Sequence, residues 1–148
     1  MKRVKYLSEN LQETKKIAGE FLKKTHPQSK SATVVELIGN LGSGKTAFVK
    51  AAAEVLGLKN TVSSPTFVIQ KIYKLRNKEF DYLIHLDAYR LENGKELKIL
   101  GWQNILSSPE NLIFIEWPEK VSDILPRGTK RVFFDFVSEN TREIKYET

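Results

Sequence analysis

The sequence predicts an α/β fold: a three-layer sandwich with a mainly parallel central sheet and a C-terminal antiparallel hairpin. Three observations support this fold class. Short runs rich in β-branched and aromatic residues alternate with segments of helical periodicity. A glycine-rich turn joins one of these strands directly to a helix. Two strand-like segments then flank Glu139 and Asn140 near the end of the sequence.

The N-terminal part is predicted to contain a short edge strand, a helix and a second strand. A stripe of residues at helical spacing indicates the helix, which we expect to run to about Lys24 and to end before a polar linker at 26–31. Asn10 and Glu13 have the spacing of a capping box at its start. The strands are expected at 4–7 and 33–38, and the stripe comprises Leu11, Thr14, Ala18 and Leu22.

The remaining elements alternate in the same way. After the glycine-rich turn, apolar residues recur at helical spacing from Ala47 to Leu56, and Gly57 is a suitable C-cap. Another helix is expected over 96–106. Strands are expected over 67–75, 82–86, 112–115, 131–137 and 141–146, with a hairpin turn at 76–79.

Length and composition are those of an ordinary soluble protein. The chain has 148 residues, of which 41% are hydrophobic and 28% are charged. We expect residues 1–148 to form one domain with one core. Apolar runs are strand-sized and no apolar signal region follows the N-terminus, so we expect a cytoplasmic protein that does not contact the membrane. The sequence has no cysteine, which excludes disulfides and zinc–thiolate sites.

The formal net charge of +6 has two interpretations. A basic protein is suited to contact with nucleic acid or with an acidic partner. A lysine-rich solvated surface is the simpler explanation of the charge. The lysines are spread along the chain without a block of five or six, which favours the solvated surface.

The glycine-rich turn matches the phosphate-binding pattern G-x-x-x-x-G-K-[ST] in full. It comprises Gly39, Asn40, Leu41, Gly42, Ser43, Gly44, Lys45 and Thr46. Glycines let the backbone aim several N–H groups at one anion, and the following helix points its N-terminus at the phosphates. Lys45 supplies positive charge for the β- and γ-phosphates, and the Thr46 hydroxyl suits Mg²⁺. A plain strand-to-helix turn is the alternative, but it needs neither Lys45 nor Thr46. We therefore predict a P-loop NTPase sandwich.

Two acidic residues, Asp87 and Glu116, each end a strand-like apolar run. Ligands collect beyond the carboxyl ends of the strands of a parallel sheet, so we expect both acids at the same edge as the P-loop. There they are suited to hold Mg²⁺ or its waters. A helix N-cap is the alternative role for either acid, and it is a weaker explanation for two acids beside one P-loop.

Four further features have two interpretations each. The segment 64–66, Ser-Pro-Thr, is either a mobile loop whose hydroxyls sense the γ-phosphate or a plain proline turn. A lone histidine such as His85 is more often packed or hydrogen-bonded than catalytic. Arg90 is placed either to pair with an acid or to reach a phosphate. Trp102 and Trp117 are most simply packing residues, and Trp117 is also placed to wall the nucleotide site because it follows Glu116.

Four segments of the sequence carry further information: GNLGSGKTAF at 39–48, SPTF at 64–67, HLDAYRL at 85–91 and IEWP at 115–118. Together these motifs resemble the TsaE family, also called YjeE, the bacterial ATPases of tRNA threonylcarbamoyladenosine synthesis. The P-loop is common to many families, whereas the set of S-P-T-F, H-x-D-x-Y-R and E-W-P is specific. The resemblance runs from the N-terminal helix to 125–126. It departs in lacking a glycine just upstream of Ser64 and in Ala88, where leucine is commoner.

The resemblance implies that the chain binds and hydrolyses ATP with Mg²⁺. It also implies action with TsaB and TsaD, which put a threonylcarbamoyl group on the adenosine beside the anticodon. The chain would meet tRNA indirectly through that complex, and we expect it to be a monomer or a weak dimer when alone. Its ATPase is expected to be weak alone and stimulated by the partner complex. We find no obvious internal arginine finger, and Arg90 is the best internal candidate.

Mapped by motif, the resemblance also implies roles for individual residues. Residues 39–47 would contact the nucleotide, together with Thr66 as the switch-loop threonine. The metal ligands would be Thr46, Glu116 and Asp87, and the catalytic residues would be Lys45, Asp87 and Glu116. The start of the first helix, near 10–14, would flank the adenine.

Two other functions compete with this one. A small-molecule kinase on the same fold needs a second pocket and usually an arginine-rich lid, for which 148 residues leave little room. A tRNA-binding module without catalysis would show salt-sensitive binding to tRNA and no affinity for ATP.

Overall fold

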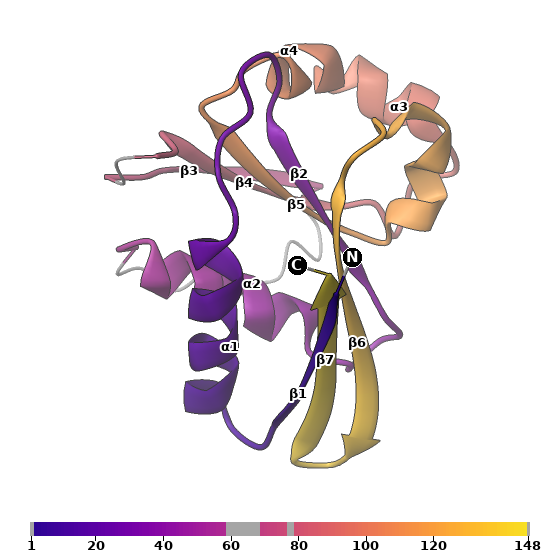
Figure 1. Cartoon of the computed structure of the whole chain (residues 1–148). Helices are drawn as coiled ribbons and strands as arrows, with labels where there is room; N and C mark the ends of the chain where they lie inside the picture. Colours follow the sequence, from indigo (N-terminus) through magenta and orange to yellow (C-terminus); the bar gives the residue numbers. More distant parts are fainter. Residues whose placement is uncertain (1, 59–68, 77–78, 148) are drawn as a thin grey trace.

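The computed structural model describes residues 2–58, 69–76 and 79–147, and these form one seven-stranded sheet. The strand order is β1-β7-β6-β2-β5-β4-β3 (Figure 1). The strands are β1 (Arg3–Ser8), β2 (Thr33–Ile38), β3 (Gln70–Lys74), β4 (Tyr82–Asp87), β5 (Asn111–Glu116), β6 (Lys130–Ser138) and β7 (Thr141–Glu147).

The centre of this sheet is parallel and both of its edges are antiparallel. β6, β2, β5 and β4 pair in parallel. β7 and β1 add antiparallel strands on one side, and β3 adds one on the other. The α/β sandwich with a parallel centre is therefore confirmed. The predicted C-terminal hairpin, β6–β7, is part of the same sheet because β6 pairs with β2.

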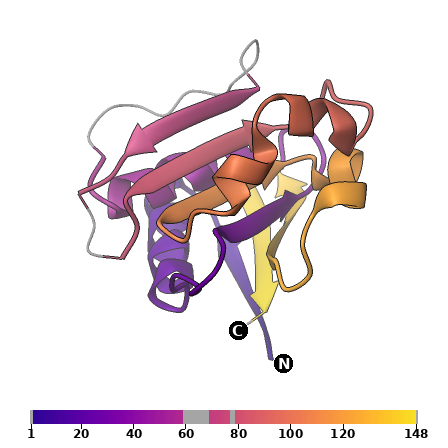
Figure 2. The same cartoon turned by 90° about the horizontal axis from the view of Figure 1, so that it is seen from above.

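Helices cover both faces of the sheet, which gives three layers (Figures 1 and 2). On one face, α1 (Leu11–Lys23) packs against α2 (Lys45–Val55). The opposite face carries α3 (Gly94–Ile99), α4 (Trp102–Leu106) and the 3₁₀ helix η1 (Pro118–Ile124). In the part of the chain described here, no helix is both long and apolar enough to cross a membrane.

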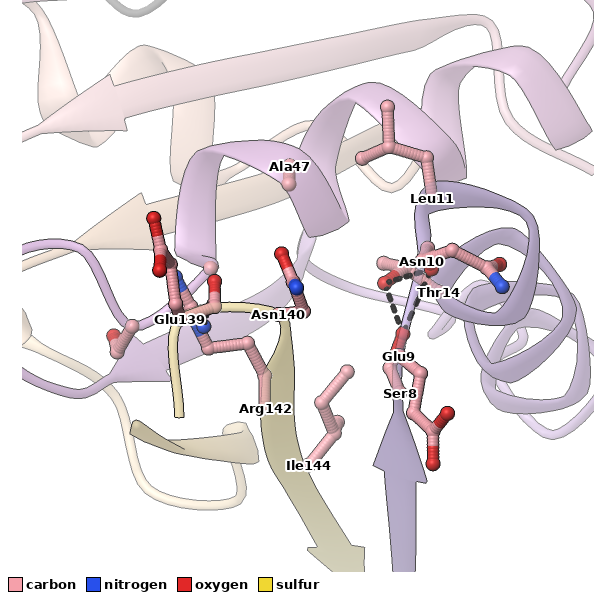
Figure 3. Close-up of a pocket in the computed structure, with 12 residues that line it drawn as sticks. Ser8, Glu9, Asn10, Leu11, Thr14, Ala47, Glu139, Asn140, Arg142 and Ile144 are labelled. Carbon is pink, nitrogen blue, oxygen red and sulfur yellow. Dashed lines mark hydrogen bonds between the residues drawn. The ribbon is translucent and has the colours of Figure 1, made fainter. Parts of the chain in front are cut away.

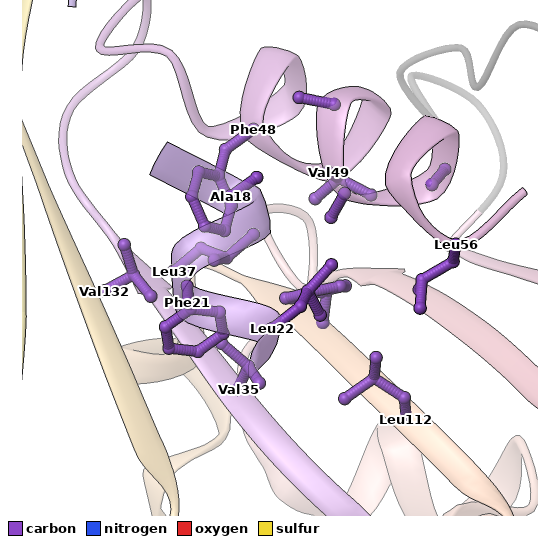
Figure 4. Close-up of a cluster of buried hydrophobic side chains, with 14 of the residues drawn as sticks. Ala18, Phe21, Leu22, Val35, Leu37, Phe48, Val49, Leu56, Leu112 and Val132 are labelled. Atoms are coloured by element: carbon purple, nitrogen blue, oxygen red, sulfur yellow. The ribbon is translucent and has the colours of Figure 1, made fainter. Parts of the chain in front are cut away.

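The sheet divides the buried side chains into two clusters, one on each face, rather than one continuous core. The larger cluster lies under α1 and α2 (Figure 4). At its centre, the fully buried ring of Phe48 packs edge-on against Phe21, Phe114 and Phe134, with centroid separations of 5.8, 6.2 and 5.4 Å. Phe48 belongs to α2, so this packing anchors the helix that follows the P-loop to three different elements.

The start of α1 has the predicted cap. The Asn10 side chain accepts a hydrogen bond from the Glu13 backbone N–H at 2.8 Å. Glu13 reaches back to the backbone N–H of Glu9 at 2.7 Å, one residue before the position that a standard capping box uses. These contacts hold the first turn of α1 rigidly beside the sheet edge.

Two local features differ from the sequence-based expectation. The helix expected over 96–106 is interrupted at Gly101, whose φ of 92° ends α3 and begins α4. Helical periodicity continues across this break, which is why the pattern alone suggested one helix. The 3₁₀ helix at Pro118–Ile124 was not expected, and it starts with Pro118 in its first turn, where a missing N–H costs nothing.

Candidate functional site

The turn between β2 and α2 has a compact backbone that depends on its glycines. Gly42 and Gly44 have φ values of 76° and 105°, in the left-handed region where other residues are strained. Gly39 is closely packed instead. A Cβ built on Gly39 would lie 2.6 Å from the Ser43 hydroxyl oxygen and 2.7 Å from the Phe134 carbonyl oxygen. Asn40 and Leu41 are exposed at the tip of the turn, whereas Ser43 is buried.

Lys45 is folded back onto this turn. Its ammonium donates a hydrogen bond to the Gly39 carbonyl oxygen at 2.6 Å and lies 3.8 Å from the centroid of the Trp117 ring. Burial lowers the pKa of Lys45, and the neighbouring carboxylates, Glu116 most strongly, act in the opposite direction. The structure thus places a cation at the mouth of the turn, where a phosphate would approach.

Glu116 is joined directly to the start of α2. The Thr46 hydroxyl lies 3.2 Å from both carboxylate oxygens of Glu116. His85 approaches the same carboxylate from β4, with 2.6 Å between its Nε2 and Oε2 of Glu116. Glu116 and His85 are 4% and 0% exposed. Three separate elements, α2, β4 and β5, therefore converge on one buried carboxylate.

Asp87 stands beside Glu116, because the two residues are register partners at the ends of β4 and β5. Its Oδ1 accepts a hydrogen bond from the Tyr89 backbone N–H at 2.9 Å. Burial raises the pKa of Asp87; the hydrogen bond from Tyr89 opposes this shift, and the charge of Glu116 adds to it. Both predicted acids therefore lie at the edge of the sheet that carries the P-loop.

Trp117 forms one wall of this edge. Its φ of 59° is the only positive value at a non-glycine residue in the described ranges, so its backbone is strained. The ring lies under Lys45 and packs against Tyr89, with 5.1 Å between the ring centroids. Trp117 is also partly buried against the apolar cluster on the face of α3 and α4, which confirms the packing expectation, and its role as a wall of a nucleotide site stays a prediction. Trp102, by contrast, is fully buried in the cluster on the opposite face.

A pocket of about 250 Å³ opens next to the P-loop, between the starts of α1 and α2 and the β6–β7 turn (Figure 3). Asn10, which caps α1, and Leu11 and Thr14 of α1 line it, and the predicted place of the adenine beside them stays a prediction. Ala47, at the start of α2, also lines it. The pocket and the P-loop are continuous, because Ser43 and Gly44 belong to both.

The β6–β7 turn is the part of the site that sequence reasoning missed. Glu139, Asn140 and Arg142 line the pocket. Arg142 donates from Nε to the Gly42 carbonyl oxygen at 2.9 Å and from Nη1 to the Ser138 carbonyl oxygen at 2.6 Å. This side chain ties the hairpin to the P-loop. No local motif predicts the contact between Arg142 and Gly42, because it depends on the sheet pairing of segments about 100 residues apart in the chain.

Three other features that the sequence singled out are the segment 64–66, His85 and Arg90. Thr66 and the rest of the segment 64–66 fall outside the described residues, so their predicted role stays a prediction. His85, expected to be packed or hydrogen-bonded, is both. Arg90 is exposed and interacts with another group of the protein.

The available ligands fit Mg²⁺ bound together with a nucleotide. Within the described residues, no group of three or more His, Cys, Asp or Glu side chains could hold a metal ion. Mg²⁺ in phosphoryl-transfer sites does not need such a group, because one or two carboxylates, phosphate oxygens and water complete its shell. The Thr46 hydroxyl and the Glu116 carboxylate are oxygen groups in contact with each other that could serve as ligands, and Asp87 adds a second carboxylate beside them.

Comparison with known proteins decides the family. The family model described as threonylcarbamoyl adenosine biosynthesis protein TsaE matches residues 8–144. The chain belongs to the TsaE family. A TsaE from Bacillus subtilis is 35% identical over 146 residues, which cover 99% of this chain and 86% of the relative. A TsaE from Haemophilus influenzae is 33% identical over 117 residues, which cover 79% and 70%.

The fold of this TsaE chain is also that of a solved structure. The crystal structure of YdiB from Bacillus subtilis matches it with a TM-score of 0.75 and 30% sequence identity. The match covers 98% of this chain and 84% of YdiB. The α/β architecture and the family resemblance expected from the motifs are therefore both confirmed.

Proposed function

We propose that this chain is a Mg²⁺-dependent ATP-binding and ATP-hydrolysing protein that serves threonylcarbamoyladenosine modification of tRNA together with TsaB and TsaD. Membership of the TsaE family and the names of the relatives, tRNA threonylcarbamoyladenosine biosynthesis proteins, support the pathway. The chemistry rests on one observation: the Thr46 hydroxyl contacts the Glu116 carboxylate at 3.2 Å, directly behind the P-loop.

The phosphates would bind over the turn at 39–46. Its backbone N–H groups and the N-terminus of α2 supply partial positive charge for an anion. Lys45 would exchange the Gly39 carbonyl oxygen for the β- and γ-phosphate oxygens, which satisfy its ammonium better because they carry charge. The low exposure of Lys45 strengthens that interaction.

Thr46 and Glu116 would hold Mg²⁺, directly or through water. When bound, the ion neutralises charge that develops on the γ-phosphoryl group. Asp87 is the better candidate to orient the attacking water, because Glu116 already accepts from Thr46 and His85 while Asp87 is less buried. Phosphoryl transfer needs positioning and charge neutralisation more than covalent help, and these residues supply both.

The adenine would occupy the pocket beside the P-loop. The start of α1 and Ala47 offer apolar surface, and Asn10 and Asn140 offer hydrogen-bonding groups for the base. The pocket adjoins the P-loop at Ser43 and Gly44, so one nucleotide can fill both parts.

The test is to measure ATP binding and phosphate release with and without TsaB and TsaD. We expect Mg²⁺-dependent ATP binding, slow release by the isolated chain and faster release in the assembly. A chain that hydrolyses ATP equally fast alone would contradict the dependence on partners, and a chain without affinity for ATP would overturn the proposal. Phosphate on a metabolite would indicate a kinase instead. Salt-sensitive tRNA binding without ATP affinity would indicate a binding module.

A further inference from the structure

His85 is a fully buried side chain to which the proposed function gives no role. Strand alternation puts His85 and Asp87 on the same face of β4, the face whose cluster includes Leu83. On β5, Glu116 lies on the matching face, in line with Leu112 and Phe114 of that cluster. β4 therefore presents two polar side chains to Glu116: Asp87 is its register partner, and His85 lies one pleat earlier, opposite Phe114.

The contact of His85 with Glu116 uses one nitrogen of the imidazole ring, Nε2, which lies 2.6 Å from Oε2 of Glu116. A carboxylate that binds Mg²⁺ is ionised and only accepts hydrogen bonds, so in the metal-bound protein Nε2 would be the donor. The other ring nitrogen, Nδ1, is buried and has no hydrogen-bond partner among the residues that the structure describes. The hydrogen bonding of the imidazole is thus directed at one oxygen of one carboxylate.

We propose that His85 is a positioning residue, which holds the Glu116 carboxylate so that it faces the Thr46 hydroxyl and the Mg²⁺ bound there. The inference rests on the proposed function, because orientation of Glu116 matters to a metal only if Thr46 and Glu116 bind one. Carboxylate ligands are themselves oriented by hydrogen bonds from the surrounding protein, and losing such a partner typically weakens metal binding about 10- to 100-fold.

The geometry explains why a hydrogen bond is needed here. Thr46 lies at the same distance, 3.2 Å, from both oxygens of Glu116, so it alone does not select one rotation of the carboxylate. His85 distinguishes the two oxygens, because it contacts only Oε2. With Oε2 occupied by the imidazole, Oε1 is the oxygen left for the metal or its water.

The test compares two substitutions of His85 by the affinity of the ADP-bound protein for Mn²⁺, measured by electron paramagnetic resonance. His85→Leu replaces the imidazole with an apolar side chain of similar size and removes the hydrogen-bond donor. We expect it to weaken Mn²⁺ binding about 10- to 100-fold. His85→Gln can place an amide N–H near the position of Nε2, so we expect it to recover most of the affinity. Affinity for ADP in EDTA should be unchanged in both variants.

Leu83→Ala is the matched control, because Leu83 is equally buried and lies one pleat earlier on the same face of β4. It should lower stability and leave Mn²⁺ affinity unchanged. If His85→Leu does not fold, His85→Asn replaces it, because the shorter amide cannot reach Glu116.

Wild-type Mn²⁺ affinity in His85→Leu, or in His85→Asn where that replaces it, would overturn the inference. An equal loss in His85→Leu, His85→Gln and Leu83→Ala would also overturn it, because it would show a packing role alone. A wild-type protein that does not bind Mn²⁺ with ADP would instead contradict the proposed function, so the two failures are distinguishable.

Discussion

Glu116 and Asp87 end neighbouring parallel strands, are register partners and look alike in the sequence, yet the structure gives them different surroundings. Glu116 is 4% exposed and accepts hydrogen bonds from Thr46 and His85. Asp87 is half-buried and accepts one from the backbone of Tyr89. The difference shows that the position at a strand end brings each acid to the site. The side chains of adjacent elements then determine how buried each acid is and which groups it contacts.

The largest effect is expected from removing the more buried acid. Glu116→Ala should reduce ATP hydrolysis about 1000-fold, because the proposed Mg²⁺ would lose a carboxylate ligand and Thr46 loses its partner. Steady-state phosphate release measures this loss, and circular dichroism checks that the fold is intact. Lys45→Ala, which removes the positive charge proposed to neutralise the phosphates, should cause a comparable loss. Near-normal turnover in both variants would contradict the site.

Asp87→Asn tests whether Asp87 has a different role from Glu116. If Asp87 orients the attacking water, this variant should lose about 100-fold in kcat while retaining its affinity for Mn²⁺ and ADP. Rapid-quench kinetics and Mn²⁺ titration separate the two quantities. A loss of metal affinity as large as that of Glu116→Ala would show that the two acids share one role.

The raised pKa of Asp87 predicts how stability depends on pH. An acid whose pKa is higher in the folded than in the unfolded protein stabilises the fold below its ordinary pKa of 3.8, and this contribution is lost as the pH rises through the folded pKa. In nucleotide-free protein, Asp87→Asn should therefore have a slightly higher Tm than wild type at pH 7. The difference should shrink as the pH approaches 4. If the Tm of Asp87→Asn lies below that of wild type at pH 7, and by more than at pH 4, the raised pKa of Asp87 would be contradicted.

The smallest effect is expected at Trp117, which lies beside both acids. The Lys45 ammonium lies 3.8 Å from the centroid of the Trp117 ring, and the proposed binding of ATP would weaken this contact. Trp117→Leu removes a cation–π interaction worth about 0.5–1 kcal/mol, so it should raise ATP affinity about two- to five-fold. Calorimetric titration measures the affinity, with Trp102→Phe on the opposite face as a control that should leave it unchanged. Weaker binding by Trp117→Leu would show that the ring contacts the nucleotide itself.

Local patterns in the sequence predicted the parts of the site that local rules control. Glycines that require left-handed backbone marked the turn, and apolar runs ending in Asp87 and Glu116 marked the strand ends. The sequence did not predict the contacts that these residues make with distant parts of the chain. Arg142 meets the P-loop only because β6 pairs with β2, and Trp117 reaches Lys45 only through a backbone conformation that its own type disfavours. The sequence predicted that His85 is packed or hydrogen-bonded, but it did not identify Glu116 as the partner, because Glu116 lies on another strand.

A crystal structure of the chain with Mg²⁺ and a non-hydrolysable ATP analogue is the most direct test. We expect the triphosphate over Gly39–Thr46, with the Lys45 ammonium moved from the Gly39 carbonyl to the phosphates. The ion should lie against the Thr46 hydroxyl and Oε1 of Glu116, directly or through one water. A nucleotide bound elsewhere, or an ion that touches neither of these residues, would contradict the account.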